Sequence, residues 1–313
     1  MVIYHYPFKE KQNIEKCVLA LGFFDGVHIA HRDLIARARA VAREKGLLLG
    51  VFTFGTGGMI KSSAKRLYDD GDKAEIFESL GADFTVIADF DAISGMSGEE
   101  FVKGVLVGDL NSEICVAGFN FRFGHRASSG EVELRRFMSE AGGEAVICEE
   151  ITAEDHVTLS ASLIRQLILD GNIRRANNIL GSPYYIKGRV SHGKKLGRKI
   201  GFPTVNIPIG DGMILPKTGV YHSAVRVGEE LYPAITNVGV CPTFDGEEPR
   251  AESFILNFSG DLYERELRVY LLDFIREERK FDSVEALKMQ IEIDTNKVIK
   301  ESENISWQEL GLK

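Results

Sequence analysis

The sequence has few of the features that mark secreted, membrane-spanning or nucleic-acid-binding proteins. Its four cysteines lie far apart without a Cys-x-x-Cys pair, which argues against a zinc site or a disulfide framework and favours a reducing cytoplasm. No apolar run approaches the roughly 20 residues that cross a bilayer, and residues 1–16 lack the pattern of a signal peptide. The formal net charge of −8 disfavours general nucleic-acid binding. We therefore expect a cytoplasmic protein with small-molecule partners, and no pattern indicates an oligomeric state.

The familiar signatures of ATP use are also missing. There is no Gly-x-x-x-x-Gly-Lys-Ser/Thr loop and no protein-kinase signature. The chain is nonetheless an ordinary globular one, because 44% of its residues are hydrophobic and 27% are charged. Its 313 residues suffice for two domains. Any nucleotide must therefore be held by another kind of phosphate-binding segment.

The two halves of the chain differ in their pattern. Residues 1–181 alternate strand-like and helix-like segments, ending in a helical pattern over 162–180, and this predicts an α/β doubly wound domain. Residues 182–313 are strand-rich and punctuated by Gly and Pro, which predicts an antiparallel β-barrel followed by a C-terminal helix. The strands are expected at 17–24, 47–54, 84–88, 114–117, 145–148, 184–190, 219–227, 232–238, 251–258 and 266–274.

A histidine pair follows the first expected strand, in the segment GFFDGVHIAH (residues 22–31). His28 and His31 are three residues apart, so they share one face of the first helical turn. In an open α/β sheet, ligands bind at the carboxyl ends of strands, where helix N-termini favour phosphate. The plainer interpretation is an Asp-Gly turn with two incidental histidines.

Three segments resemble the flavin-adenylylating branch of the nucleotidyltransferases. They are residues 22–31, the loop AGFNFRFG (117–124) and the helix start LSASLIR (159–165). The resemblance implies that His28, His31 and Arg165 stabilise charge during adenylyl transfer. It further implies nucleotide or phosphate binding by Gly22, Phe24, Asp25, Gly26, Asn120 and Ser162.

Two positions depart from that family's pattern. Ala30 stands where the family usually has Gly, and Gly55–Gly58 replaces a Pro-His-Pro element after the second strand. An added methyl group crowds a nucleotide phosphate unless the backbone shifts. These departures motivate an alternative hypothesis, in which the first domain is catalytically weak or inactive.

The second half contains GRVSHGKKLGRKIGFPTVN (residues 188–206), in which glycines are interleaved with the basic residues Lys194, Lys195, Arg198 and Lys199. Glycine permits close approach of the backbone to phosphate, so we interpret this stretch as a phosphate loop rather than as a solvated charge run. The stretch resembles the riboflavin kinase signature, which implies that Thr204 and Asn206 help place Mg²⁺. It also implies nucleotide or phosphate contacts from Gly188, His192, Gly193, Lys195, Gly197 and Pro203.

A candidate base lies on a later strand. In ESFILNF (252–258), alternation puts Glu252 on the same face as Phe254 and Leu256. If that face points into the barrel, a carboxylate there is costly without a partner or a role. Glu252 also falls where the riboflavin kinase family has its catalytic Glu; the alternative is an ion pair with a neighbouring Arg.

The two resemblances together imply a bifunctional riboflavin kinase/FMN adenylyltransferase. Such an enzyme phosphorylates riboflavin to FMN with ATP and Mg²⁺, then adenylylates FMN to FAD with a second ATP, so that flavin is substrate and product. One alternative is riboflavin kinase activity alone, with a first domain that only binds nucleotide or flavin. A non-enzymatic flavin sensor is a third hypothesis.

Overall fold

The computed structural model describes residues 1–55, 65–151, 158–193, 197, 200–243, 246–303, 305–308 and 310–312. The chain divides into two compact units, Met1–Leu159 and Ser160–Lys313. The sequence predicts a boundary after residue 181, whereas the division falls earlier because two helices pack within the second unit. Asn177 in the second of these helices donates a hydrogen bond to the Leu271 carbonyl at 2.8 Å. The limits of the functional domains therefore stay a prediction.

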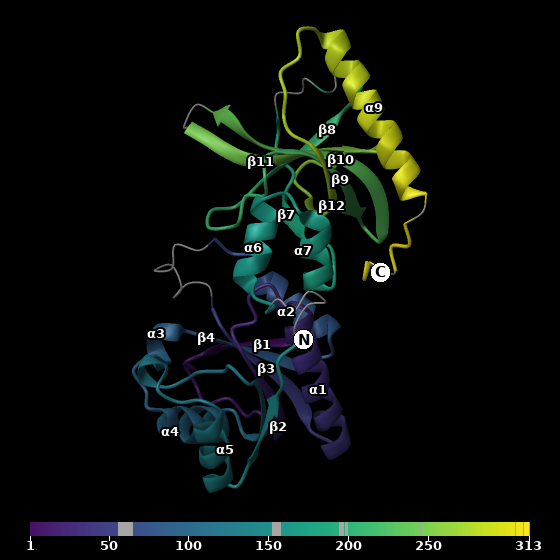
Figure 1. The fold of residues 1–313 in the computed structure, drawn as a ribbon. Coiled ribbons are helices and arrows are strands. Elements are labelled where there is room, and N and C mark those ends of the chain that lie inside the picture. Colours follow the sequence, from purple (N-terminus) through teal and green to yellow (C-terminus); the bar gives the residue numbers. More distant parts are fainter. Residues whose placement is uncertain are drawn as a thin grey trace. The chain divides into compact units, whose positions relative to one another are not determined.

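The first unit is built on a six-stranded parallel sheet (Figure 1). The spatial order of its strands is β1-β4-β3-β2-β5-β6. From β2 the chain adds β3 and β4 on one side, and it then returns to add β5 and β6 on the other side of β2, as in a doubly wound fold. The expected α/β architecture is confirmed, and the edge strand β1 is an addition. The strands are β1 (Val2–Tyr6), β2 (Cys17–Leu21), β3 (Leu48–Phe54), β4 (Phe84–Ala88), β5 (Ser112–Gly118) and β6 (Glu144–Cys148).

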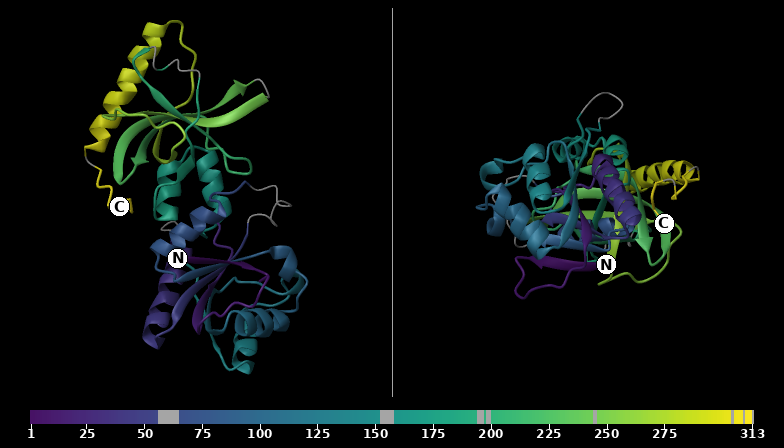
Figure 2. Two further views of the ribbon diagram at one scale, coloured as in Figure 1. Left: turned by 180° about the vertical axis from the view of Figure 1, so that it is seen from behind. Right: turned by 90° about the horizontal axis from the view of Figure 1, so that it is seen from below.

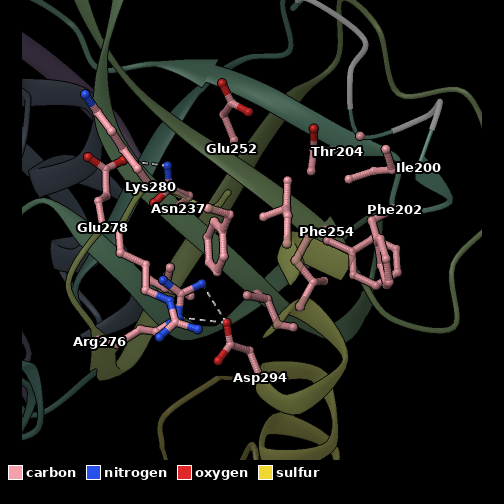
Figure 3. Close-up of a pocket in the computed structure, with 17 residues that line it drawn as sticks. Ile200, Phe202, Thr204, Asn237, Glu252, Phe254, Arg276, Glu278, Lys280 and Asp294 are labelled. Carbon is pink, nitrogen blue, oxygen red and sulfur yellow. Dashed lines mark hydrogen bonds and ion pairs between the residues drawn. The ribbon is translucent and has the colours of Figure 1, made fainter. Parts of the chain in front are cut away.

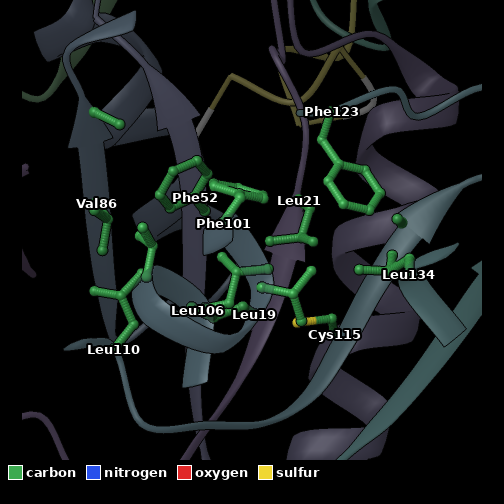
Figure 4. Packing of buried hydrophobic residues seen from close by; sticks show 14 of the residues in the cluster. Leu19, Leu21, Phe52, Val86, Phe101, Leu106, Leu110, Cys115, Phe123 and Leu134 are labelled. Carbon is green, nitrogen blue, oxygen red and sulfur yellow. The ribbon is translucent and has the colours of Figure 1, made fainter. Parts of the chain in front are cut away.

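Helices cover both faces of this sheet (Figure 2). Successive residues of a strand point to opposite faces. Leu19 accordingly joins the core under one set of helices, shown in Figure 4, while Val18 joins the core under the other set. The helices that cover the Val18 side of the sheet are α1 (Ile29–Lys45) and α2 (Asp70–Ser79). The other helices are α3 (Phe90–Ile93), α4 (Gly98–Glu100), the π-helix η2 (Phe101–Asp109), the 3₁₀-helix η3 (His125–Ala127) and α5 (Glu131–Glu140).

The second unit begins with two short helices, α6 (Ala161–Leu169) and α7 (Ile173–Leu180). The sequence predicts one helical stretch here. The break falls at Gly171, whose φ of 79° lies in the left-handed region that ends helices.

An antiparallel sheet of order β7-β12-β9-β10-β11-β8 forms the rest of this unit. Its end strands are drawn together where the Ser191 amide donates to the Asn206 carbonyl at 2.8 Å, which gives the nearly closed barrel expected from the sequence. The elements are β7 (Tyr185–Arg189), β8 (Thr204–Pro208), β9 (Gly219–Val227), β10 (Glu230–Thr243), β11 (Gly246–Ile255), β12 (Glu266–Arg276) and α9 (Val284–Ser302). Within the described part of the chain, no helix is both long and apolar enough to cross a membrane.

Candidate active sites

The turn between β2 and α1 has a strained backbone. Phe24 and Val27 adopt φ values of 49° and 41°, which side chains other than glycine rarely tolerate, and Gly26 lies at 79°. The Phe24 side chain is fully buried under the turn. A Cβ atom on Gly22 would lie 2.9 Å from the Phe24 ring, so glycine is required there. Strain of this kind persists only where the surrounding structure fixes it.

His28 and His31 lie directly after this turn. His28 is the N-cap of α1, and the two imidazole rings stack with centroids 3.7 Å apart. Within the part of the chain that the structure describes, the Nδ1 atoms of both rings are buried without a hydrogen-bond partner. Burial lowers the pKa of His28 to about 4, and burial together with the His28 charge lowers that of His31 to about 3. Both imidazoles are therefore neutral at pH 7, and the helix N-terminus beside them favours an anion.

An aromatic cluster borders the histidine turn where β2, β3 and β4 end. The ring of Phe23 lies 4.5 Å from that of Phe54 and 6.3 Å from that of Phe90. Phe23 and Phe90 are 42% and 37% exposed, although large apolar side chains are usually covered. An exposed aromatic ring held in place by neighbouring rings can stack on a planar ring system. Sequence reasoning did not single this cluster out.

The loop after β5 combines a polar tip with an apolar base. Its turn closes where the Phe121 amide donates to the Gly118 carbonyl at 3.0 Å, which leaves Asn120 exposed at the tip. Phe121 and Phe123 pack against the core below, as the plainer interpretation of an aromatic-rich loop expects. Because β5 is the parallel neighbour of β2, Asn120 and the histidine turn follow adjacent strands at the same edge of the sheet.

Ser162 and Arg165 lie on α6, in the second unit. The cap of this helix is Ser160, whose hydroxyl accepts a hydrogen bond from the Leu163 amide at 3.2 Å. Ser162 is therefore not needed as a cap. A joint role of Ser162 and Arg165 with the histidine pair stays a prediction.

In the second unit, strand register brings three polar side chains together. Glu252 on β11 is paired with Asn206 on β8 and with Asn237 on β10. Directly opposed residues in antiparallel strands point to the same face. The next row on that face contains Thr204 opposite Phe254. The sequence predicts Glu252 and Phe254 on one face, and the structure confirms this placement.

That face forms one wall of a cavity of about 670 Å³ (Figure 3). Thr204, Asn237 and Glu252 line it on the sheet side, and α9 contributes Leu287 and Asp294. The remaining lining is mainly apolar, with aromatic rings at Phe202, Phe254 and Phe281. A mostly apolar cavity with a few polar groups is typical of a small-molecule site.

Thr204 and Asn206 are suited to a hard cation. Asn206 is 6% exposed, and its side-chain carbonyl oxygen is buried without a hydrogen-bond partner among the described residues. A buried acceptor without a donor is costly, and a cation satisfies it. A Cβ atom on Gly193 would lie 2.6 Å from that amide group, and one on Gly197 would lie 3.6 Å from the Thr204 hydroxyl oxygen. The glycines therefore bring the loop close to both ligand candidates.

A second cavity, of about 270 Å³, adjoins the first. Pro203 and Tyr263 line it, and Thr204 lines both cavities. The His192 ring lies 4.1 Å from that of Tyr263. Gly188 lies on β7 at a position where a Cβ atom would meet the Ile207 side chain at 2.8 Å. Lys195 lies outside the described residues.

Comparison with known proteins finds a matching protein family for each half of the chain. The riboflavin kinase family model matches residues 180–301, and the FAD synthetase model matches residues 10–162. A bifunctional riboflavin kinase/FMN adenylyltransferase from Bacillus subtilis is 35% identical over 312 residues, which covers 96% of each chain. The chain belongs to this family.

Other members of the family support the same assignment. The Listeria monocytogenes protein is 36% identical and covers 93% of this chain and 94% of its own, and the Escherichia coli protein is 33% identical with 90% and 91% covered. A crystal structure described as a macrolide-efflux protein from Streptococcus pneumoniae matches with a TM-score of 0.87 and 31% identity, covering 98% of this chain and 100% of the other.

Several residues of the large cavity were missed by sequence reasoning. Arg276 on β12 forms an ion pair with the buried Asp294 on α9, with Nη2 and Oδ2 2.9 Å apart. Asn237 donates to the Glu278 carboxylate at 2.8 Å (Figure 3). These partners are far apart in sequence and carry no spacing signal. The signal that could have indicated Asn237 is strand alternation, which places it on the same face of β10 as Ile235, another residue of the cavity lining.

Proposed function

We propose that the protein phosphorylates riboflavin with ATP and then adenylylates FMN to FAD with a second ATP. The observation that carries this proposal is that each unit has its own set of reactive groups: Glu252 with Thr204 and Asn206 in one, and the neutral pair His28 and His31 in the other. The absence of Pro-His-Pro and the presence of Ala30 favour a kinase-only alternative. The intact histidine pair favours the two-step function.

For the kinase step, we assign the two adjoining cavities to the two substrates. The larger cavity suits the riboflavin ring system because aromatic and aliphatic side chains make up much of its lining. The smaller one suits the nucleotide because Val190, Pro203 and Thr204 of the proposed phosphate loop line it. Thr204 lies between them, where the transferred phosphoryl group must pass. Positioning of this kind supplies most of the catalysis in phosphoryl transfer.

Glu252 is the base in this scheme. Its carboxylate orients the 5′-hydroxyl of riboflavin and accepts its proton, while the hydroxyl oxygen bonds to the γ-phosphorus of ATP and ADP departs. Thr204 and Asn206 would hold Mg²⁺, which when bound neutralises charge on the phosphates. Backbone groups of Gly188, Gly193 and Gly197 and the side chains of His192 and Lys195 would contact the nucleotide.

For adenylyl transfer, an FMN phosphate oxygen attacks the α-phosphorus of ATP and pyrophosphate leaves. His28 and His31 are neutral and offer one N–H each to the oxygens that gain charge. We assign Arg165 to the leaving pyrophosphate and Asn120 and Ser162 to phosphate contacts. The exposed ring of Phe23 suits stacking on the flavin. No covalent enzyme intermediate is needed.

The deciding experiment is a time course with purified protein, riboflavin, ATP and Mg²⁺, in which flavins are separated by chromatography. FMN followed by FAD is the expected result. Accumulation of FMN alone would leave the kinase-only function, and no consumption of ATP would indicate a flavin sensor. The free, buried thiols of Cys17, Cys115 and Cys148 fit a reducing compartment, so we propose the cytoplasm as the location.

A further inference from the structure

The strained histidine turn is held by two side chains, Thr53 and Arg32, to which no contact with substrate has been assigned. Thr53 on β3 is fully buried, and its hydroxyl donates to the Phe23 carbonyl at 2.8 Å. Arg32, in the first turn of α1, donates from Nε to the Val27 carbonyl at 3.1 Å. Each bond therefore holds a backbone carbonyl group at one of the two strained residues. The Phe23 carbonyl belongs to the peptide bond that leads into Phe24, and the Val27 carbonyl belongs to a residue that is itself strained.

These two bonds bear directly on the histidine pair. Val27 is followed at once by His28, so the orientation of the Val27 peptide sets the start of α1. Phe24 packs edge-on against the His31 ring, with centroids 5.2 Å apart. A shift of Phe24 or Val27 would thus move one imidazole relative to the other. Among the described residues the Nδ1 atoms of the histidines find no hydrogen-bond partner, so ring packing and the turn contribute to the orientation of the imidazoles.

We infer that Thr53 and Arg32 are positioning residues for adenylyl transfer: they hold the turn between Gly22 and His28 in the strained conformation that aligns the two imidazoles. This inference rests on the proposed function of the first unit. Neither residue is assigned a contact with substrate. Their effect should therefore appear in the rate of the chemical step and not in the binding of ATP or FMN.

The test compares two substitutions with two matched controls in the full-length protein, and a fifth variant keeps the threonine's hydroxyl group. Thr53→Val keeps the shape of the side chain but removes the donor to Phe23, and Arg32→Met keeps the stem but removes the donor to Val27. Matched controls lie in the same unit: Thr85→Val changes a fully buried threonine of β4, and Arg39→Met removes an arginine of α1 that donates to the Leu80 carbonyl.

We expect Thr53→Val and Arg32→Met to lower kcat for FAD formation from FMN by ~10-fold to ~100-fold, the range that a misplaced catalytic group produces. KM for ATP should change little, and riboflavin kinase activity of the same preparation should be retained. Thr53→Ser keeps the hydroxyl that Thr53→Val removes, so this variant should retain most of the rate of FAD formation. Both controls should behave like the unchanged protein.

The outcomes separate this inference from the proposed function. Unchanged kcat in both test variants, or an equal loss in the controls, would overturn the positioning role. A loss that disappears when the assay is run well below the unfolding temperature of the variant would mean that the bonds serve stability alone, and would also overturn it. If the unchanged protein makes FMN but no FAD, the adenylyl transfer itself is wrong and the inference falls with it.

Discussion

The two sites present their reactive groups on different kinds of backbone. In the first unit the two histidines lie three residues apart in sequence and follow a strained turn between a parallel strand and a helix. In the second unit Asn206, Asn237 and Glu252 come from three strands and meet through antiparallel register. A turn can present two reactive groups within one short motif, whereas a sheet brings its reactive groups together from segments that are far apart in the sequence.

The chemistry differs in the same way. The first site combines neutral imidazoles with a helix N-terminus and an aromatic surface, which suits the stabilisation of charge without a strong base. The second combines a carboxylate with uncharged oxygen ligands, which suits proton removal beside a hard cation. If this division is correct, substitutions at one site should leave the other reaction untouched.

The largest effect is expected at Glu252. Glu252→Gln removes the proton acceptor while keeping the size of the side chain, so kcat for FMN formation should fall by ~10²-fold to ~10⁴-fold. FAD formation from added FMN should be unchanged. Both rates are measured by chromatography of the flavins, with Glu266→Gln, an exposed carboxylate on β12, as the matched control. Full kinase activity in Glu252→Gln would exclude the base role.

His28→Ala gives the reciprocal result. Loss of one donor to the transferring group should lower kcat for FAD formation by ~10²-fold to ~10³-fold, and the riboflavin reaction should then stop at FMN. A stopped time course measures both steps in one sample. His5→Ala, which alters an exposed histidine on the edge strand β1, is the control. Kinase activity lost together with adenylylation would contradict the independence of the two sites.

A smaller effect is expected from Gly193→Ala. The added Cβ atom would lie 2.6 Å from the Asn206 amide and should displace the buried oxygen assigned to Mg²⁺. We expect roughly a tenfold loss of kinase rate, consistent with misplacement of a positioning group, and a higher requirement for Mg²⁺. A magnesium titration of the rate checks this. Gly210→Ala is the control, since its Cβ atom would meet only Met213 at 3.9 Å; equal losses in both variants would argue against the assignment.

The smallest expected effect is a decrease in the free energy of unfolding at low pH. A histidine of the unfolded chain takes up its proton near pH 6.5, whereas the pKa of folded His28 is about 4 and that of folded His31 about 3. The unfolded state therefore binds more protons below pH 6.5, and the free energy of unfolding should decrease as the pH falls from 6.5 toward 4. At pH 5 the loss should be about 1–2 kcal/mol for each histidine.

The measurement is an NMR titration of the imidazole resonances in the full-length protein, assigned with His28→Gln and His31→Gln. Neither resonance should shift between pH 8 and about pH 5. A midpoint near 6.5 for either ring would show that burial does not hold it neutral.

Much of the fold could be predicted because hydrophobic period and turn residues are local properties. The strands at 84–88 and 219–227 lie where alternating or continuous apolar residues place them. The short edge strand β1 was missed because its residues are partly exposed and its pattern is weak. The helical pattern over 162–180 was predicted as one helix, since the apolar period continues across the break at Gly171.

By itself, the sequence determined the two architectures and the segments that carry the chemistry, because glycines, histidines and strand alternation act within a few residues of one another. Only the tertiary structure decided which groups meet. The Arg276–Asp294 pair, the alignment of Asn237 with Glu252 and the support of the histidine turn by Thr53 all join residues distant in the chain. Such contacts depend on register and packing, which no local pattern specifies.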